Sequence, residues 1–404
     1  MQECKFPKLE RITENYRDPQ LFENKETHLR PLFKEIQLHK ASDIIIVEGK
    51  PILVNIQNRL YAATYRNLTL TEAQWFLTEL AGKIALTSIN SRKAVNTSYN
   101  LFEGAALTDA EINEGKIRVR NAYRVNASGI MNRGVPSFQI VLRTIPSEPI
   151  LYHKLGLSEE LVLMCCPING LVLIAGVTGS GKSTTLASII RYILENNTPI
   201  RGNIITHEEP IEYTYDSIQS EHSIVVQSQI PENFESFEAA NREAMRRKPA
   251  GIIVGELRDT ETISSAIEAA QTGHPVFGTV HASSIISIVS RLVRKFTEDQ
   301  SSALYDIISE SSMFIAQRLI PDINGKLFAV REYLFLTEAV KDKLKYLEDY
   351  KEVNNVILEL MKNGSNDPRS TASLTFEKQG ELLFQEGRIN ENGLVYLRGQ
   401  HEEV

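Results

Sequence analysis

Cysteine is scarce in this sequence, which has three: Cys4, Cys165 and Cys166. These are too few and too unevenly spaced for a disulfide framework or a zinc site. Their scarcity fits a reducing cytoplasm, and we expect Cys165 and Cys166 to be packing residues.

A hydrophobic run long enough to cross a membrane is also missing. The longest apolar stretch, Leu161–Gly176, is interrupted by Pro167 and Asn169 and falls short of the ~20 residues that a spanning helix needs. The N-terminal stretch Met1–Gln20 is charged throughout and has no apolar core, so we expect no signal peptide. The sequence therefore predicts a cytoplasmic protein with no transmembrane segment.

An excess of positive charge is the third absence. The net charge is −7 and the pI is about 5.8, so no direct nucleic-acid binding is expected. The composition, 42% hydrophobic and 24% charged, is that of an ordinary globular protein. A chain of 404 residues is expected to form two domains.

The first half of the sequence predicts a small α+β domain at 31–148, after a polar N-terminal extension at 1–30. Two β-branched runs, Ile44–Val47 and Ile52–Ile56, are separated by a turn-like segment. Leu70–Ala81 has helical spacing, and Arg118–Arg143 alternates as strands do. The segment Thr144–Pro149 carries two prolines and no periodicity, which marks it as the linker.

After the linker the pattern changes to apolar strand, loop and helix, repeated. The helices expected are Lys182–Leu194 and Thr260–Ala270. This alternation predicts a doubly wound α/β core at 149–330, and we expect 331–404 to be helical. The expected buried parallel strands are Leu171–Ala175, Asn203–Thr206, Ile252–Val254 and Pro275–Val280.

A phosphate-binding loop follows the first of these strands. Gly176–Ser183 reads G-V-T-G-S-G-K-S, which matches G-x-x-x-x-G-K-[ST] between a strand and a helix. Glycines allow successive N–H groups to face phosphates, while Lys182 reaches the β- and γ-phosphates and Ser183 ligates Mg²⁺. The nucleotide-binding residues expected here are Gly176, Thr178, Gly179, Ser180, Gly181, Lys182, Ser183 and Thr184.

Carboxylates and histidines follow other strands of the same core. His207–Glu212 carries three carboxylates, a residue type that can orient water for attack on a γ-phosphate. Glu256 ends an apolar strand, as a carboxylate on the Mg²⁺ side would. His274 and His281 bracket the next strand. Because parallel strands end at one edge of a sheet, the groups that follow strands are expected to share a crevice with the phosphate loop.

Together these motifs resemble the hexameric secretion and pilus ATPases of the PilT-like type. Gly176–Ser183 is similar to the Walker A motif of that family, and His207–Tyr213 to its acidic box. Gly255–Glu256 resembles its Walker B end and Thr272–His281 its His box. The similarity covers roughly residues 33–345, including Arg124–Ser147 upstream and, downstream, Ser309–Ser312 and Ala316–Arg318.

The resemblance implies a PAS-like N-terminal domain on a RecA-like core, six subunits in a ring, and ATP with Mg²⁺ as ligands. It implies that Glu212, or in second place Glu208, orients the attacking water. Glu256 would support Mg²⁺ with Ser183, and His281 would sense the γ-phosphate.

The resemblance also implies arginine fingers from the N-terminal domain. The candidates are Arg124 and Arg133, or Arg118 and Arg120 nearby. Such fingers accelerate phosphate transfer ~10³–10⁵-fold in other systems.

Some positions depart from the pattern of the family. Ala250 stands where an acidic residue is usual in the family. Glu256 is therefore expected to provide more of the carboxylate support for Mg²⁺. The sequence element typical of pilus-retraction members is absent, as is a four-cysteine module. These departures look more like the type IVB secretion and conjugative plasmid transfer branch, of the DotB-like and TraJ-like ATPases.

The sequence therefore predicts a motor that works on inner-membrane secretion or transfer machinery, bound to it from the cytoplasm. A pilus-retraction motor is the alternative within the family. A small-molecule kinase would carry the same loop but transfer phosphate to an acceptor other than water. A DNA translocase is disfavoured by the acidic balance.

Overall fold

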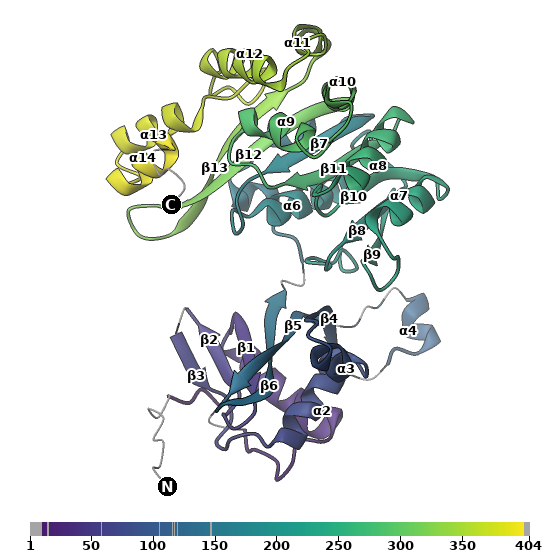
Figure 1. Cartoon of the computed structure of the whole chain (residues 1–404), viewed down its shortest axis with the longest axis vertical. Coiled ribbons are helices and arrows are strands. Elements are labelled where there is room, and N and C mark those ends of the chain that lie inside the picture. Colours follow the sequence, from purple (N-terminus) through teal and green to yellow (C-terminus); the bar gives the residue numbers. More distant parts are fainter. Residues whose placement is uncertain are drawn as a thin grey trace. The chain divides into compact units, whose positions relative to one another are not determined.

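The computed structural model describes residues 10–399 except 14–15, 58, 105, 115, 117, 119 and 146–147 (Figure 1). Parts of the predicted N-terminal extension (1–9, 14–15), of the linker (146–147) and of the C-terminal region (400–404), together with Cys4, lie outside the described residues. The chain divides into two compact units, Met1–Ser147 and Glu148–Val404.

The smaller unit is an antiparallel sheet with the strand order β3-β2-β1-β6-β5-β4. Helices pack on one face of this sheet around a shared core that includes Phe33, Phe76 and Tyr123. The strands are β1 (Asp43–Val47), β2 (Leu53–Ile56), β3 (Arg59–Ala62), β4 (Val95–Phe102), β5 (Arg120–Asn132) and β6 (Val135–Ile145). The helices are η1 (Lys25–Leu29), α1 (Arg30–Leu38), α2 (Leu70–Ala81), α3 (Ala85–Asn90) and α4 (Asp109–Asn113).

Helix α2 begins where its sequence provides a capping box. The Thr69 side chain accepts a hydrogen bond from the Glu72 N–H, and the Glu72 carboxylate accepts one from the Thr69 N–H. This arrangement satisfies two of the N–H groups that a helix start leaves without partners. The helix ends at Gly82, whose φ of 92° favours glycine.

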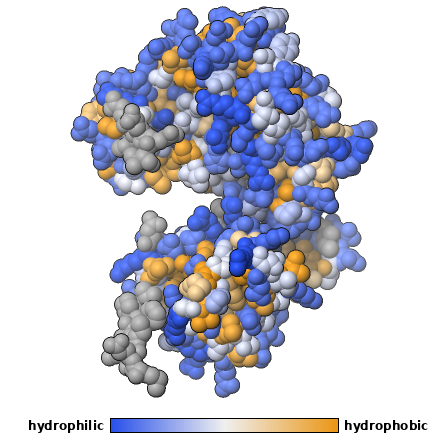
Figure 2. Space-filling model, viewed as in Figure 1, coloured by the Kyte–Doolittle hydropathy of each residue, from blue (hydrophilic) through white to orange (hydrophobic). Residues whose placement is uncertain are grey.

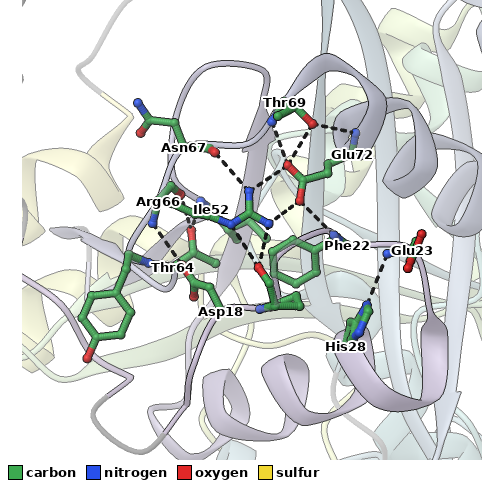
Figure 3. A network of polar contacts seen from close by, with 12 residues as sticks. Asp18, Phe22, Glu23, His28, Ile52, Thr64, Arg66, Asn67, Thr69 and Glu72 are labelled. Atoms are coloured by element: carbon green, nitrogen blue, oxygen red, sulfur yellow. Dashed lines mark hydrogen bonds and ion pairs between the residues drawn. The ribbon is translucent and has the colours of Figure 1, made fainter.

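An ion pair between the buried Glu72 and the partly exposed Arg66 attaches the N-terminal segment to the smaller unit (Figure 3). Glu72, which is fully buried, accepts hydrogen bonds from the Phe22 N–H at 2.8 Å and from the Arg66 guanidinium. Arg66 also donates to the Pro19 carbonyl, and the Asp18 carboxylate accepts the Tyr65 and Arg66 N–H groups. The described residues from Tyr16 onward are therefore packed against the domain.

The larger unit is a seven-stranded sheet with the order β13-β12-β7-β11-β10-β8-β9. All neighbouring pairs are parallel except β12 and β13, which are antiparallel. The strands are β7 (Gly170–Ala175), β8 (Asn203–Glu208), β9 (Ile224–Gln229), β10 (Pro249–Val254), β11 (Pro275–Val280), β12 (Ser311–Pro321) and β13 (Leu327–Phe335).

Two cores cover the two faces of this sheet. One includes residues of α5 (Glu159–Met164) and α6 (Lys182–Glu195), and the other includes residues of α7 (Phe237–Met245) and of α8 (Thr260–Gln271). Side chains of α9 (Ile285–Val293) and α10 (Gln300–Glu310) join this second core. The prediction of a RecA-like α/β core beside a smaller α+β unit is confirmed.

Four helices follow β13: α11 (Glu338–Leu344), α12 (Tyr350–Lys362), α13 (Phe376–Gln385) and α14 (Glu391–Arg398). The helical region predicted from the sequence begins at about Arg331, whereas residues 331–335 still belong to β13. The reason is the pairing of β13 along the whole of β12. The buried Glu332 accepts the Ile285 and Phe376 N–H groups, so one carboxylate joins the starts of α9 and α13.

In the view of Figure 2, hydrophobic residues on the surface form small groups separated by hydrophilic ones. Within the described part of the chain, none of the helices combines the length and the apolar character needed to span a membrane.

The hydrogen bonds of Glu72 predict that removing its charge lowers the stability of the protein. Burial alone would raise the pKa of Glu72, but hydrogen bonds from Arg66, Thr69 and Phe22 outweigh burial and lower this pKa to about 2. We expect Glu72→Gln to lower the free energy of unfolding at pH 7 by about 1.5–3 kcal/mol, because the partly exposed Arg66 loses a charged hydrogen-bond partner. Urea unfolding measures this change.

The matched control is Glu79→Gln on the same helix, since Glu79 pairs with Lys25 near the surface and its loss is expected to cost at most ~1 kcal/mol. The stability supplied by Glu72 is present above the unfolded pKa and is lost as the pH falls toward 2, so the difference between wild type and Glu72→Gln should narrow on acidification. Equal costs for the two variants would contradict this account.

Candidate functional site

The phosphate loop leaves the fully buried strand β7 and enters α6. Glycine is required at two of its positions. A Cβ on Gly176 would lie 2.7 Å from the Gln317 carbonyl oxygen, and Gly181 has a φ of 84°. Thr178 and Gly179 are exposed, while the Ser180 side chain is buried. The loop is thus packed against Gln317 on one side and is exposed to solvent on the side of Thr178 and Gly179.

Lys182 is the buried cation of the loop. Its Nζ donates to the carbonyls of Gly176 at 2.9 Å and Val177 at 3.1 Å. Burial lowers the pKa of Lys182, and the negative charges of Glu256 and Glu212 partly oppose that shift. Both carboxylates therefore act electrostatically on the lysine that begins α6.

The acidic loop after β8 is held by Glu208. Its carboxylate accepts hydrogen bonds from the Thr206 hydroxyl at 2.7 Å, the Gln227 amide at 3.0 Å and the Glu212 N–H at 3.4 Å. Burial raises the pKa of Glu208, and these hydrogen bonds oppose the shift. Since its oxygens are already engaged, Glu208 positions the loop that carries Glu212.

Glu256 and His281 lie together at the ends of β10 and β11. The His281 Nε2 is 3.4 Å from the Glu256 Oε1, and both side chains are partly exposed. The Thr279 hydroxyl donates to the Gly255 carbonyl, which ties the two strand ends to each other. The charges of Glu212 and Glu256 act on Lys182, and His281 contacts Glu256, so these groups gather near the carboxyl ends of the strands.

The start of α6 contacts the acidic loop directly. The Thr184 and Tyr213 hydroxyls are 2.8 Å apart. Ser183, the neighbour of Thr184, is partly buried at the first turn of the helix. The two hydroxyl residues after Lys182 therefore lie at the helix N-terminus, where the helix dipole favours anions.

Two further residues at this loop, Gln317 and Arg331, were not predicted from the sequence. Gln317 on β12 donates to the Ser180 carbonyl, and Arg331 on β13 donates to Gln317. The only signal at the sequence level was the family resemblance of Ala316–Arg318. Their contact with the loop depends on the position of β12 beside β7, which local patterns do not reveal.

A cavity of about 790 Å³ adjoins the loop within the larger unit. Its wall includes Gly181 and Thr184 from the loop and α6, and Arg331 from β13. Leu155 and Leu382 add apolar surface from the segment before α5 and from α13. A volume of this size is typical of small-molecule sites.

The candidate arginine fingers Arg124 and Arg133 lie in the smaller unit. Arg124 is exposed on β5, directly opposite Arg143 of β6. Arg133 occupies the β5–β6 turn with a φ of 51°, and its guanidinium lies against Gly49. At ~3.3 Å per residue along β5, Arg124 and Arg133 are roughly 25–30 Å apart. They cannot both reach one phosphate from the same subunit.

The alternative finger Arg118 has partners inside its own unit. Its guanidinium donates to the Gly104 carbonyl at 2.7 Å and lies 4.9 Å from the centre of the Phe102 ring. Arg120 begins β5, opposite Phe102.

His207 is buried beside the acidic loop without a polar partner. It is 0% exposed, neither ring nitrogen has a hydrogen-bond partner among the described residues, and its ring packs against Phe234. Burial, with a smaller contribution from Arg247, lowers the pKa of His207 to about 4.

This burial predicts a dependence of stability on pH. Because the folded-state pKa lies below the unfolded value, the unfolded chain binds a proton first as the pH falls, and stability is lost between about pH 6.5 and 4. We expect His207→Leu to remove roughly 1–2 kcal/mol of the loss between pH 7 and pH 5. Urea unfolding of both proteins at the two pH values measures it, and identical losses would refute the prediction.

The chain is similar to known proteins along most of its length. Residues 25–343 match the family of type II/IV secretion system proteins. The ATPase DotB of Yersinia pseudotuberculosis is 39% identical with a TM-score of 0.76, and the match covers 98% of this chain and 99% of that one. The structure of the pilus retraction motor PilT with bound ADP is 29% identical with a TM-score of 0.73, covering 91% and 95%.

The type IV pilus retraction ATPase PilT of Pseudomonas aeruginosa is 39% identical over 224 residues, which are 55% of this chain and 62% of that protein. This match spans less than two thirds of the relative. The match to the family model covers the greater part of the chain, and the likeness to DotB extends over nearly all of it. The chain therefore belongs to the type II/IV secretion system protein family, and it is similar to the ATPases PilT and DotB.

Proposed function

We propose that this protein is a motor ATPase that hydrolyses ATP to ADP and phosphate and so drives a type IV secretion or conjugative transfer machine. The observation that carries the enzymatic part is the buried Lys182 of the phosphate loop, on which the charges of Glu212 and Glu256 act. A phosphate loop beside two carboxylates at one edge of a parallel sheet suits in-line attack by water on a γ-phosphate.

Each residue has a role in this proposal. The N–H groups of the loop and Lys182 bind the phosphates, and Glu212 orients the attacking water. Glu208 is a positioning residue, because its carboxylate holds the Glu212 N–H. His281, within 3.4 Å of Glu256, senses the γ-phosphate through that contact. The cavity beside Thr184 accommodates the remainder of the nucleotide.

The residues present also fit Mg²⁺. Ser183 and Glu256 supply the hard oxygen donors that it prefers. Among the described residues, no group of three or more His, Cys, Asp or Glu side chains could hold a metal ion. This composition fits an ion that takes one or two protein ligands and completes its shell with phosphate oxygens and water. When bound, Mg²⁺ neutralises phosphate charge.

The machine and the assembly are inferred from relatives. The likeness to DotB covers nearly the whole chain at higher identity than the likeness to the PilT structure, which favours the type IVB secretion and conjugation branch. We propose a homo-hexamer bound at the cytoplasmic face of the inner membrane. A pilus-retraction motor is the second candidate, supported by the 39% identity to a retraction ATPase over part of the chain.

Turnover of ATP without an added acceptor is the first test. We expect phosphate release that rises more than linearly with protein concentration and is abolished in Lys182→Ala. Glu212→Gln should bind ATP as wild type does. Its turnover should fall by about 10²-fold or more, since a carboxylate that handles the water proton contributes ~10²–10⁴-fold.

Glu209→Gln is the matched control in the same loop, because Glu209 is paired with Arg258 at 2.8 Å. This substitution should leave turnover unchanged. Equal hydrolysis by wild type and Glu212→Gln would refute the role of Glu212. ADP formation that requires a small-molecule acceptor, and that yields the phosphorylated acceptor in place of free phosphate, would favour a kinase.

Arginine fingers that act across subunits predict complementation. We expect inactive Arg124→Ala or Arg133→Ala protein to regain activity when mixed with inactive Lys182→Ala protein, because each kind of subunit supplies the group that the other lacks. Steady-state phosphate release over a range of mixing ratios measures this gain. Failure of both arginine variants to gain activity at any ratio would count against fingers acting in trans.

A further inference from the structure

Strand β12 approaches the phosphate loop closely at Gln317. Its carbonyl oxygen lies 2.7 Å from where a Cβ on Gly176 would stand, and its Nε2 lies 2.9 Å from where a Cβ on Gly181 would stand. Real Cβ atoms do not approach other atoms so closely. Gly176 therefore makes room for the backbone of Gln317, and Gly181 makes room for its side chain.

The Gln317 amide has a defined orientation. Its Oε1 accepts hydrogen bonds from the Thr185 hydroxyl and from the Arg331 Nε, both at 2.7 Å. Arginine can only donate, so the oxygen of the amide must face Arg331. The Nε2 consequently faces the loop, where it donates to the Ser180 carbonyl at 2.5 Å.

Arg331 is held by neutral acceptors. Its three nitrogens donate to the Gln317 Oε1, to the Leu155 carbonyl at 2.8 Å and to the Thr185 hydroxyl at 3.3 Å. Burial lowers the pKa of Arg331 to about 10, so the guanidinium stays charged at neutral pH. A buried cation is costly unless its hydrogen bonds are satisfied, and here they link β13, α6 and Gln317.

The planarity of the peptide bond connects this contact to phosphate binding. In a trans peptide, the C=O of one residue and the N–H of the next point in opposite directions. When Gln317 holds the Ser180 carbonyl toward β12, the Gly181 N–H must point away from β12. That is the exposed side of the loop, where N–H groups bind phosphates.

We propose that Gln317 is a positioning residue that sets the Ser180–Gly181 peptide for phosphate binding, and that Arg331 orients its amide. This inference rests on the proposed nucleotide site. If Gln317 has this role, loss of the hydrogen bond from its amide to the Ser180 carbonyl weakens nucleotide binding even where the stability of the fold is unchanged.

The isosteric variant Gln317→Glu separates binding from stability. It keeps both acceptors for Thr185 and Arg331, and its carboxylate pairs with the Arg331 charge, but it cannot donate to the Ser180 carbonyl. Gln317→Met removes the donor without adding charge. For each variant, titration with a fluorescent ADP derivative gives the Kd, thermal unfolding gives the Tm, and phosphate release gives kcat and KM.

Arg318→Met is the matched control. Arg318 is the next residue of β12 and points to the opposite face of the sheet, where it donates to the Tyr396 and Leu397 carbonyls. Its loss should lower the Tm without changing the Kd for ADP.

We expect the Kd for ADP to rise about tenfold or more in both Gln317 variants, which corresponds to ~1.4 kcal/mol. Gln317→Glu should retain the wild-type Tm, and KM for ATP should rise more than kcat falls. An unchanged Kd in Gln317→Glu, or a Kd that follows the Tm across all three variants, would overturn the inference. Wild type that binds ADP but releases no phosphate would instead refute the proposed function alone.

Discussion

The close packing of β12 beneath the phosphate loop is the constraint on which the site depends. Gly176 cannot carry a side chain because the Gln317 backbone lies there, and the Ser180 carbonyl is held by the Gln317 amide. The strand order places β7 between β12 and β11, so the loop has Gln317 on one side. On the other side lie the strand ends that carry His281 and Glu256.

Electrostatic balance divides the acidic residues into two groups. Glu208 is partly buried, and its oxygens accept hydrogen bonds from Thr206, Gln227 and the Glu212 backbone. Glu212 and Glu256 act on the charge of Lys182 instead. A carboxylate that is already saturated by donors is suited to hold a loop, while one beside the phosphate loop is suited to chemistry. The action of the Glu212 charge on Lys182 supports the proposal that Glu212 orients the attacking water.

Local sequence signals predicted much of this architecture. The α2 range Leu70–Ala81 agrees with its capping box, and the G-x-x-x-x-G-K-S loop lies between a strand and a helix as expected. Gln317 and Arg331 were missed because their partners, Ser180 and Thr185, are more than 130 residues away in sequence. The sequence could not separate Glu208 from Glu212, because both follow one strand, and the action of the Glu212 charge on Lys182 depends on the fold.

The same two strands serve both faces of the sheet. Gln317 and Arg331 reach the phosphate loop on one face, while Arg318 and Glu332 hold α14, α13 and α9 on the other.

The central claim is that water is the phosphate acceptor at this loop. A single turnover of Mg·ATP in water labelled with heavy oxygen tests it most directly. The account predicts one labelled oxygen in each phosphate released, and unlabelled phosphate, or none, would contradict it.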